Sequence, residues 1–178
     1  ALFFNLYSAD EPPPQINLTQ LATAVQDGRV QEITVDGDRA GRVAGEPVGS
    51  VGRGYLLLVG FKSGDDEGTL HWMVEKVRGL RLFPDEQGKM NRSLLDTGGS
   101  ALVVSQFTLY GDTRKGLRPS FTGACEPKRA EELYQRFASE LGYLGVPVKT
   151  GKFAARMDVD LVNNGPVTIL LDTEEDGK

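Results

Sequence analysis

Two stretches of the chain are apolar at nearly every position, and they predict the strands at the centre of the fold. The first runs from Tyr55 to Phe61 and the second from Ala101 to Tyr110. A strand with one solvent-exposed face alternates apolar and polar residues, whereas a strand buried on both faces is apolar throughout. The first stretch is typical of a strand buried on both faces, and the second predicts another strongly apolar strand.

Helical spacing of apolar residues appears in two other segments. From about residue 69 to residue 80, an apolar stripe follows the three- and four-residue steps of a helix. Its members are Leu70, Met73, Val77 and Leu80. A second helix is predicted to start at Glu126-Pro127 and to end at Gly142, since proline suits a first turn and glycine a helix end. Its predicted buried face consists of Ala130, Leu133, Tyr134, Phe137 and Leu141.

Short apolar or alternating segments predict further strands. They cover residues 30–35, 39–43, 48–51, 146–150, 157–161 and 167–171, and Asp36-Gly37 is a good hairpin turn between the first two. A short helix is also predicted near residues 18–25. Because strands outnumber helices, the predicted class is α+β, with a mixed, largely antiparallel sheet or partial barrel and two main helices.

The length of 178 residues suits one compact domain. Three consecutive prolines, Pro12 to Pro14, exclude helix interior and central strand, so residues 1–28 are predicted to be an extension. Residues 29–172 then form the single domain and residues 173–178 an acidic tail. No apolar run approaches the ~20 residues that span a bilayer. The single cysteine, Cys125, rules out an internal disulfide and suits the cytoplasm, where we expect the protein to be.

Charge limits the kind of nucleic-acid contact that the chain can make. Twenty basic and 25 acidic residues give a net charge of −5, which argues against non-specific coating of nucleic acid. A small local patch that grips one end of an RNA remains compatible with this charge. Two clusters are candidates: Arg114, Lys115 and Arg118 form one, and Lys149, Lys152 and Arg156 the other. From the sequence alone, solvated surface charge is the favoured explanation for both.

Most familiar catalytic machinery is missing from the sequence. One histidine, His71, and one cysteine, Cys125, cannot build the usual zinc site, and no Gly-x-Ser-x-Gly motif is present. The glycines of residues 49–54 are in the wrong order for a phosphate-binding loop. We therefore expect no metal and no cofactor. If the chain is an enzyme, its substrate must be labile or must bring its own catalytic group.

Four motifs occur in a fixed order: Ser105-Gln106-Phe107-Thr108-Leu109, Arg118-Pro119-Ser120-Phe121, Thr150-Gly151-Lys152-Phe153-Ala154-Ala155-Arg156-Met157 and Asn163-Asn164-Gly165-Pro166-Val167-Thr168. In this order and spacing, the series resembles the D-aminoacyl-tRNA deacylases. Residues 88–91 and 99–104 resemble the same family. The resemblance covers most of the chain, from about Glu46 to Leu171.

The resemblance implies hydrolysis of the ester between a D-amino acid and the terminal ribose of tRNA, as a chirality proofreading step. It implies that the 2′-hydroxyl of the terminal adenosine assists, so no histidine is needed. It also implies a homodimer in which a cis Gly165-Pro166 bond enters the active site of the partner subunit. Its carbonyl groups then exclude an L side chain, while glycyl-tRNA is accepted. Taken alone, residues 163–166 are ordinary turn chemistry.

Site residues carried over from the resemblance fall into three groups. Ser105, Gln106, Phe107 and Thr108 are expected to line the pocket for the ester and the adenosine. Phe153, Ala154 and Met157 flank it, and Arg114, Lys115, Arg118, Lys149 and Lys152 are candidate tRNA contacts. Thr108 is a nucleophile, a proton donor or a positioning group; positioning is favoured because no base is available to activate it. Phe107 is either a pocket or a core residue.

Two alternatives and one departure accompany this interpretation. A related deacylase that removes misplaced L-alanine would carry a trans Gly-Pro bond, although the Ser105 to Leu109 run favours the D-specific branch. A non-catalytic nucleic-acid-binding protein on the same fold is the other alternative. Family members usually begin with a strand that carries Gln-Arg-Val, which this chain does not show cleanly. No arginine is therefore assigned from the N-terminal region.

Overall fold

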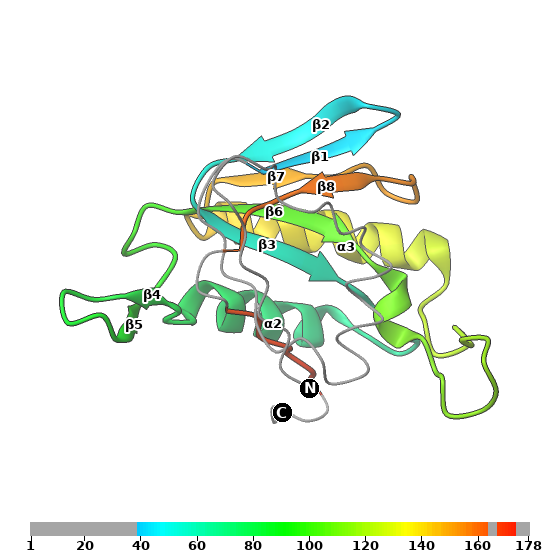
Figure 1. Cartoon of the computed structure of the whole chain (residues 1–178). Coiled ribbons are helices and arrows are strands. Elements are labelled where there is room, and N and C mark those ends of the chain that lie inside the picture. The colour runs from blue at the N-terminus through cyan, green and yellow to red at the C-terminus, as the bar shows by residue number, and fades with distance from the viewer. Residues whose placement is uncertain (1–38, 164–166, 174–178) are drawn as a thin grey trace, which may run out of the picture.

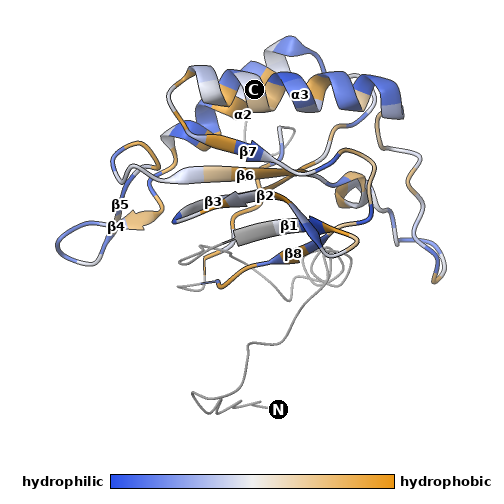
Figure 2. Ribbon diagram, turned by 90° about the horizontal axis from the view of Figure 1, so that it is seen from above, coloured by the Kyte–Doolittle hydropathy of each residue, from blue (hydrophilic) through white to orange (hydrophobic). Residues whose placement is uncertain are grey.

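The computed structural model describes residues 39–163 and 167–173. In this part of the chain, two helices, a parallel sheet and an antiparallel sheet form three successive layers (Figure 1). Figure 2 shows α2 and α3 on one side of the parallel sheet and the antiparallel sheet on the other. No helix within these residues is long and apolar enough to cross a membrane.

The middle layer is a parallel sheet in the order β3, β6, β7. It comprises β3 (Gly54–Val59), β6 (Ser100–Ser105) and β7 (Val148–Thr150). Leu56 pairs with Leu102, and Val103 pairs with Thr150. The two central strands predicted from their apolar sequence are thus confirmed, and they are direct neighbours.

Alternate residues of the central strands face two different cores. Tyr55, Ala101 and Val103 belong to the core beneath the helices. Leu102 and Val104 belong to a second core, between the two sheets. The strand β6 is therefore buried on both faces, which explains why its sequence is apolar without alternation.

The predicted strand over residues 101–110 is too long. β6 ends at Ser105, and a 3-10 helix, η1 (Phe107–Tyr110), follows it. The N–H of Gly111 donates to the Thr108 carbonyl at 3.0 Å, which closes this turn. An apolar run shows that a segment is buried or half-buried, but it does not distinguish a strand from a tight turn of the same composition.

The antiparallel sheet has the order β2, β1, β8. Its strands are β2 (Glu46–Val51), β1 (Arg39–Val43) and β8 (Asp158–Asp160). Ala44 and Gly45, both with positive φ, make the turn between β1 and β2. A Cβ atom at Gly49 of β2 would lie 2.6 Å from the Thr150 carbonyl oxygen of β7, so only glycine allows the sheets to approach this closely.

Both main helices form close to where the sequence predicts them. α2 (Glu67–Gly79) begins after Asp66, whose carboxylate accepts from the Thr69 N–H at 2.8 Å. α3 (Pro127–Tyr143) continues through Gly142, so the predicted end at that residue is wrong. Gly145 takes the positive φ of 95° that ends many helices. The four large residues of the predicted face of α3 are all buried: Leu133, Tyr134, Phe137 and Leu141.

The α+β class with two helices and mixed sheets is confirmed, and the described strands do not close into a barrel. The hairpin of β4 (Phe83–Pro84) and β5 (Met90–Arg92) was not predicted. Residues 167–171 join no sheet formed by the described residues, although their composition predicts a strand. Pairing depends on distant partners, which composition does not reveal. The strand at 30–35 and the helix near 18–25 lie outside the described residues.

The hydroxyl of Tyr134 in α3 joins two neighbouring strands at their carboxyl ends. It donates to the carbonyl of Val103 in β6 at 2.8 Å, and the carbonyl of Gly151, after β7, lies 3.4 Å away. The Tyr134 ring packs against Phe153 with centroids 5.7 Å apart. Burial raises the pKa of Tyr134 to about 12, so the hydroxyl stays protonated and able to donate.

The variant Tyr134→Phe keeps the ring and removes this donor. The free energy of unfolding is expected to fall by about 1–2 kcal/mol, because a buried hydrogen bond is lost. Urea titration measures the change. Tyr143→Phe, at an exposed tyrosine of the same helix, is the matched control and should leave the midpoint unchanged. Equal midpoints for the two variants would contradict the role of the Tyr134 hydroxyl.

Two exposed polar contacts join α2 to α3. Nδ1 of His71 bonds a carboxylate oxygen of Glu140, and Arg136 pairs with Glu67. The hydrogen bond to Glu140 raises the pKa of His71 above its ordinary value. The stabilisation from a raised histidine pKa is complete below the pKa of the unfolded chain, and it is lost as pH rises through the folded pKa.

The variant His71→Gln tests this linkage. The stability difference between wild type and variant is expected to be larger at about pH 5.5 than at about pH 8.5, values that bracket the ordinary histidine pKa. Urea titration at the two pH values measures it. Glu140→Gln removes the carboxylate that raises the pKa of His71, so the pH-dependent part of the free energy of unfolding should be lost in this variant as well. A difference that stays constant across this range would rule out the His71–Glu140 contact in solution.

Candidate functional site

The residues that resemble a deacylase pocket lie where the parallel strands end. Because β3, β6 and β7 run in the same direction, their carboxyl ends share one edge of the sheet. Gly60, Ser105-Gln106 and Gly151 stand at this edge. Open α/β sheets bind ligands outside this edge, because the loops there carry polar groups that the buried strands cannot carry.

Gln106 is the best-anchored polar residue of this edge. Gln106 is only 8% exposed, and its backbone N–H donates to the Val59 carbonyl of β3 at 2.9 Å. Its side-chain amide donates to the hydroxyl of Thr108. A neutral amide donor orients a hydroxyl but does not remove its proton. This contact therefore fits a positioning role for Thr108.

Gly60 was not singled out from the sequence, yet the turn at the end of β6 needs it. A Cβ atom there would lie 2.9 Å from the Gln106 carbonyl oxygen and 3.1 Å from the ring of Tyr110. The glycine at the end of the apolar stretch 55–61 was the available signal, since glycine after a buried strand often marks close backbone contact.

Phe107 lies at the surface and not in the core. Its side chain is 58% exposed, and its ring meets the ring of Phe121 edge to face, with centroids 5.1 Å apart. The alternative of a core role for Phe107 is therefore wrong. The 3-10 turn rotates this side chain away from the strand alternation that the sequence predicted.

Met157 lies beside the end of β6 through the turn that follows β7. The N–H of Gly151 donates to the Val103 carbonyl at 2.9 Å, and the Lys152 N–H approaches Sδ of Met157 at 3.3 Å. A Cβ atom at Gly151 would lie 2.8 Å from that sulfur. Met157 also packs in the core between the sheets, next to Val104.

The other two residues expected to flank the pocket have surroundings that differ from those of Met157. Phe153 packs against Tyr134 in the core beneath the helices. Ala154 is exposed and has a positive φ of 57°, which is uncommon for a residue with a Cβ atom. The structure thus brings Ser105, Gln106, Thr108 and Met157 to one edge, with Phe153 behind it.

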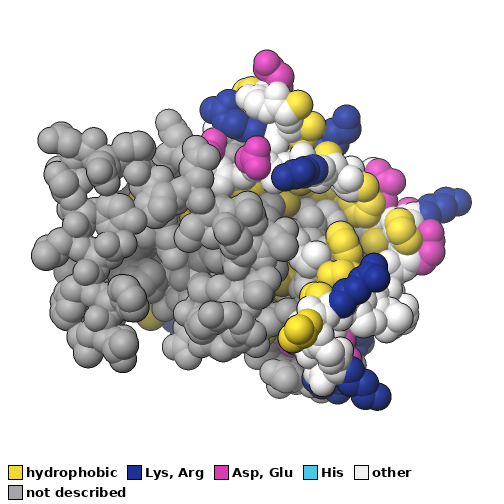
Figure 3. Space-filling model, turned by 45° about the vertical axis from the view of Figure 1, so that its right-hand side comes forward, with side chains coloured by type: hydrophobic (Ala, Val, Ile, Leu, Met, Phe, Trp, Pro, Cys, Tyr) yellow, Lys and Arg dark blue, Asp and Glu magenta, His cyan; other side chains and the backbone are white. Residues whose placement is uncertain are grey.

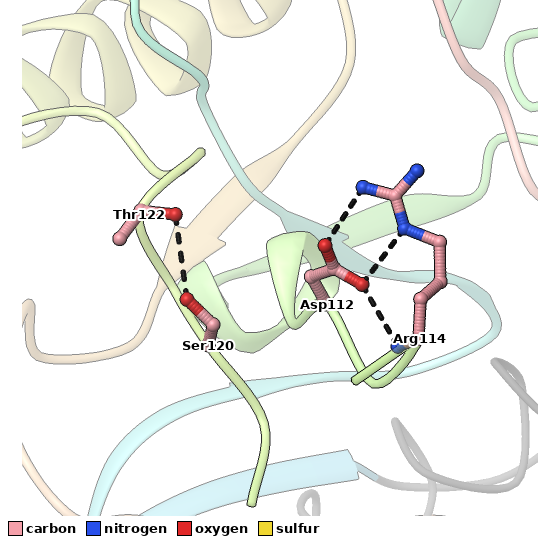
Figure 4. A network of polar contacts seen from close by, with 4 residues as sticks. All are labelled: Asp112, Arg114, Ser120 and Thr122. Carbon is pink, nitrogen blue, oxygen red and sulfur yellow. Dashed lines mark hydrogen bonds and ion pairs between the residues drawn. The ribbon is translucent and has the colours of Figure 1, made fainter. Parts of the chain in front are cut away.

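A basic loop follows η1, and two backbone hydrogen bonds close it between Asp112 and Ser120. Asp112 also holds Arg114 in a fork, with Nε to Oδ1 at 2.9 Å and Nη2 to Oδ2 at 2.7 Å (Figure 4). The hydrogen bond from Arg114 lowers the pKa of Asp112 to about 2. Arg114, a candidate tRNA contact, is therefore already paired within the loop.

The remaining candidate tRNA contacts are exposed. Lys115 and Arg118 lie on the basic loop, and Lys149 and Lys152 lie on β7 and in the turn after it. None of the four forms a salt bridge within the part of the chain that the structure describes. Unlike Arg114, these four side chains are therefore not held by an ion pair to another described residue.

The two reactive side chains considered from the sequence do not meet. His71 bonds Glu140, whereas Cys125 follows the basic loop and its N–H donates to the Phe61 carbonyl at 2.8 Å. Burial raises the pKa of the Cys125 thiol, which disfavours the thiolate. Residues 39–163 and 167–173 contain no cluster of three or more His, Cys, Asp or Glu side chains that would hold a metal.

The predicted chirality filter falls outside the described residues. Asn163, Val167 and Thr168 are described and half-buried, but Gly165 and Pro166 are not described. The cis geometry of the Gly165-Pro166 bond therefore stays a prediction.

Comparison with known proteins adds an independent line of evidence. A sequence of the D-aminoacyl-tRNA deacylase of Thermomicrobium roseum is 59% identical over 147 residues, which cover 83% of this chain and 92% of the relative. The D-aminoacyl-tRNA deacylase of Halalkalibacterium halodurans is 51% identical and covers 74% of this chain and 90% of the relative.

Two solved structures are similar. A c-Myc DNA unwinding element binding protein matches with a TM-score of 0.73 at 38% identity, over 80% of this chain and 95% of its own. A probable eukaryotic D-amino acid tRNA deacylase matches with a TM-score of 0.62 over 75% of this chain and 92% of its own; at 18% identity it shows the fold alone.

The family profile described as D-Tyr-tRNA(Tyr) deacylase matches residues 27–172, which include every residue of the sheet edge described above. Together with relatives of more than half identical sequence, this match shows that the chain belongs to the D-Tyr-tRNA(Tyr) deacylase family.

Proposed function

We propose that the chain hydrolyses the ester between a D-amino acid and the 3′-terminal adenosine of tRNA, releasing both. The observation that carries this proposal is the 59% identity to a D-aminoacyl-tRNA deacylase over 83% of the chain. The position of Ser105, Gln106, Thr108 and Met157 near one sheet edge supports the proposal that the ester binds there. Release of wrongly attached D-amino acids would make the protein a proofreading enzyme.

The side chains of this edge suggest that the substrate assists its own hydrolysis. Hydroxyl, amide and thioether side chains do not titrate near neutral pH, so none of them is a ready general base. The 2′-hydroxyl of the substrate lies directly beside the ester, where it would orient the attacking water and relay a proton from that water to the departing 3′-oxygen. The protein contributes position and hydrogen bonds, which lower the barrier without acid–base chemistry of its own.

Substrate positioning is assigned to Gln106, which is fixed to β3, and to Thr108, whose hydroxyl accepts from the Gln106 amide. Stabilisation of the developing negative charge is assigned to main-chain N–H groups of the pocket, because the pocket side chains supply no cation for this role.

Selection of the D form is assigned to Gly165 and Pro166 of a partner subunit in a homodimer. A cis peptide bond would direct both carbonyl groups toward the α-carbon of the substrate, where an L side chain would collide with them. Glycine has no side chain, so glycyl-tRNA would also be hydrolysed. Discrimination by exclusion needs rigid groups rather than additional attractive contacts.

A second candidate function has one specific observation in its favour. The solved structure with 38% identity is titled a DNA unwinding element binding protein. A chain with that activity would bind duplex DNA and would not need to cleave an ester. The net charge of −5 weighs against broad DNA affinity, because that affinity comes from many phosphate contacts.

Matched D- and L-tyrosyl-tRNA distinguish these functions. The D ester is expected to be hydrolysed at least about 100-fold faster than the L ester, because a rigid filter excludes the L side chain. Release of labelled tyrosine measures both rates, and reactions without protein give the spontaneous rate. Equal enzymatic rates, or no rate for the D ester, would overturn the proposal. Tight, salt-sensitive duplex DNA binding without hydrolysis would support the second candidate.

Replacing the terminal adenosine of D-tyrosyl-tRNA by its 2′-deoxy form tests the chemical role of the substrate. The single-turnover rate is expected to fall about 10²- to 10⁴-fold, the range that a positioned proton-transfer group contributes. Competition with intact substrate checks that the deoxy form still binds. A deoxy substrate cleaved at the full rate would leave substrate assistance without support.

A further inference from the structure

A pair of phenylalanine rings lies on the surface directly beside the candidate site. Phe107 is 58% exposed and Phe121 is 38% exposed, and their rings meet at an interplanar angle of 67°. Phe107 follows Gln106, so the pair adjoins the pocket residues but is not enclosed by them. Apolar ring surface that stays exposed to water is unfavourable, and such patches are typical of binding surfaces.

The segment that carries Phe121 is held in a defined conformation. The Asp112 N–H donates to the Ser120 carbonyl at 2.7 Å, and the Ser120 N–H donates back to the Asp112 carbonyl at 2.9 Å. The hydroxyls of Ser120 and Thr122 lie 3.3 Å apart on either side of Phe121 (Figure 4). A ring fixed in this way loses little conformational entropy when a ligand binds.

The loop between the two phenylalanines in the sequence carries basic side chains. The Arg114 guanidinium neutralises Asp112, so the basic loop keeps the charges of Lys115 and Arg118, which have no ion-pair partner among the described residues. On the face that Figure 3 shows, the described part of the molecule presents hydrophobic side chains together with both basic and acidic ones. Exposed rings beside cations that have no ion-pair partner among the described residues do not suit an apolar protein partner.

We propose that Phe107 and Phe121 form a stacking platform for an unpaired base that precedes the terminal adenosine of the RNA. Lys115 and Arg118 would contact the phosphates of the same single strand. Single-stranded nucleic acid presents flat apolar bases and regularly spaced negative charges, which match these two sets of side chains. The inference rests on the proposed function only for the identity of the RNA; the platform itself follows from the rings and the loop.

Binding of a labelled RNA single strand of about eight nucleotides that ends in CCA tests the platform. The RNA carries no amino acid, so binding is measured without hydrolysis. A series of strands, each lacking one base among the last four, locates the stacked position. Phe121→Leu removes the ring but keeps an apolar side chain, and Phe121→Tyr keeps the ring. Tyr143→Leu removes an exposed ring at the end of α3 and serves as the control.

Wild type is expected to lose about ten-fold or more in affinity when one base before the terminal adenosine is missing, because stacking on an aromatic ring is worth about that much. Phe121→Leu should bind the intact strand about ten-fold more weakly than wild type. Removal of the same base should not lower the affinity of this variant further. Phe121→Tyr and Tyr143→Leu should behave as wild type. Arg118→Ala should reduce the salt dependence by about 0.7 in logarithmic slope, the value for one phosphate contact on a single strand.

The platform is overturned if wild type binds all strands equally, or if Phe121→Leu binds no more weakly than Tyr143→Leu. Thermal unfolding of each variant separates a lost fold from a lost ring, and Phe121→Tyr decides the case if Phe121→Leu does not fold. Hydrolysis of D-tyrosyl-tRNA by wild type is scored separately. If the enzyme is active but binds all strands of the series equally, the platform alone is refuted. If the enzyme is inactive but loses affinity when one particular base is missing, the proposed function alone is refuted.

Discussion

Burial of β6 on both faces is the constraint on which the rest of the structure depends. Its residues Ala101 to Val104 have no exposed surface, because the helices cover one face and the antiparallel sheet the other. Such a strand has room only for apolar side chains along its length. The polar residues of the candidate site therefore begin where the strand ends, at Ser105 and Gln106.

The same constraint explains how so few polar groups are held in place. Gln106 is anchored through its backbone to β3, and through its side chain to Thr108. The turn after β7 is anchored to β6 by the Gly151 N–H and by the Tyr134 hydroxyl. A site without a strong acid or base depends on position, and position is what a doubly covered sheet supplies.

Elements with a local signal were predictable from the sequence. The apolar stretch 55–61 and the apolar stripe of α3 predicted a central strand and a buried helix face. Buried positions require apolar residues, and their spacing follows the period of the strand or helix. The surface position of Phe107 was not predictable, because the turn η1 interrupts the strand alternation at this residue. That turn packs closely against Gly60 through Tyr110, a contact that the local sequence does not reveal. Nor did the basic cluster reveal that Arg114 is paired with Asp112, because that contact depends on the closed loop. The edge residues themselves came from motif resemblance rather than from pattern.

Gly49 has a consequence beyond its own strand. Its missing side chain lets β2 press against the Thr150 carbonyl from one face of β7, while Tyr134 holds the neighbouring Gly151 from the other face. The turn that carries Met157 to the sheet edge is thus clamped between two layers that contain no site residue. Support for the turn thus extends to Gly49, a half-buried residue that is not part of the candidate site. A larger side chain at position 49 would push the sheets apart and displace the turn that carries Met157. The candidate site would then be altered although every one of its residues is still present.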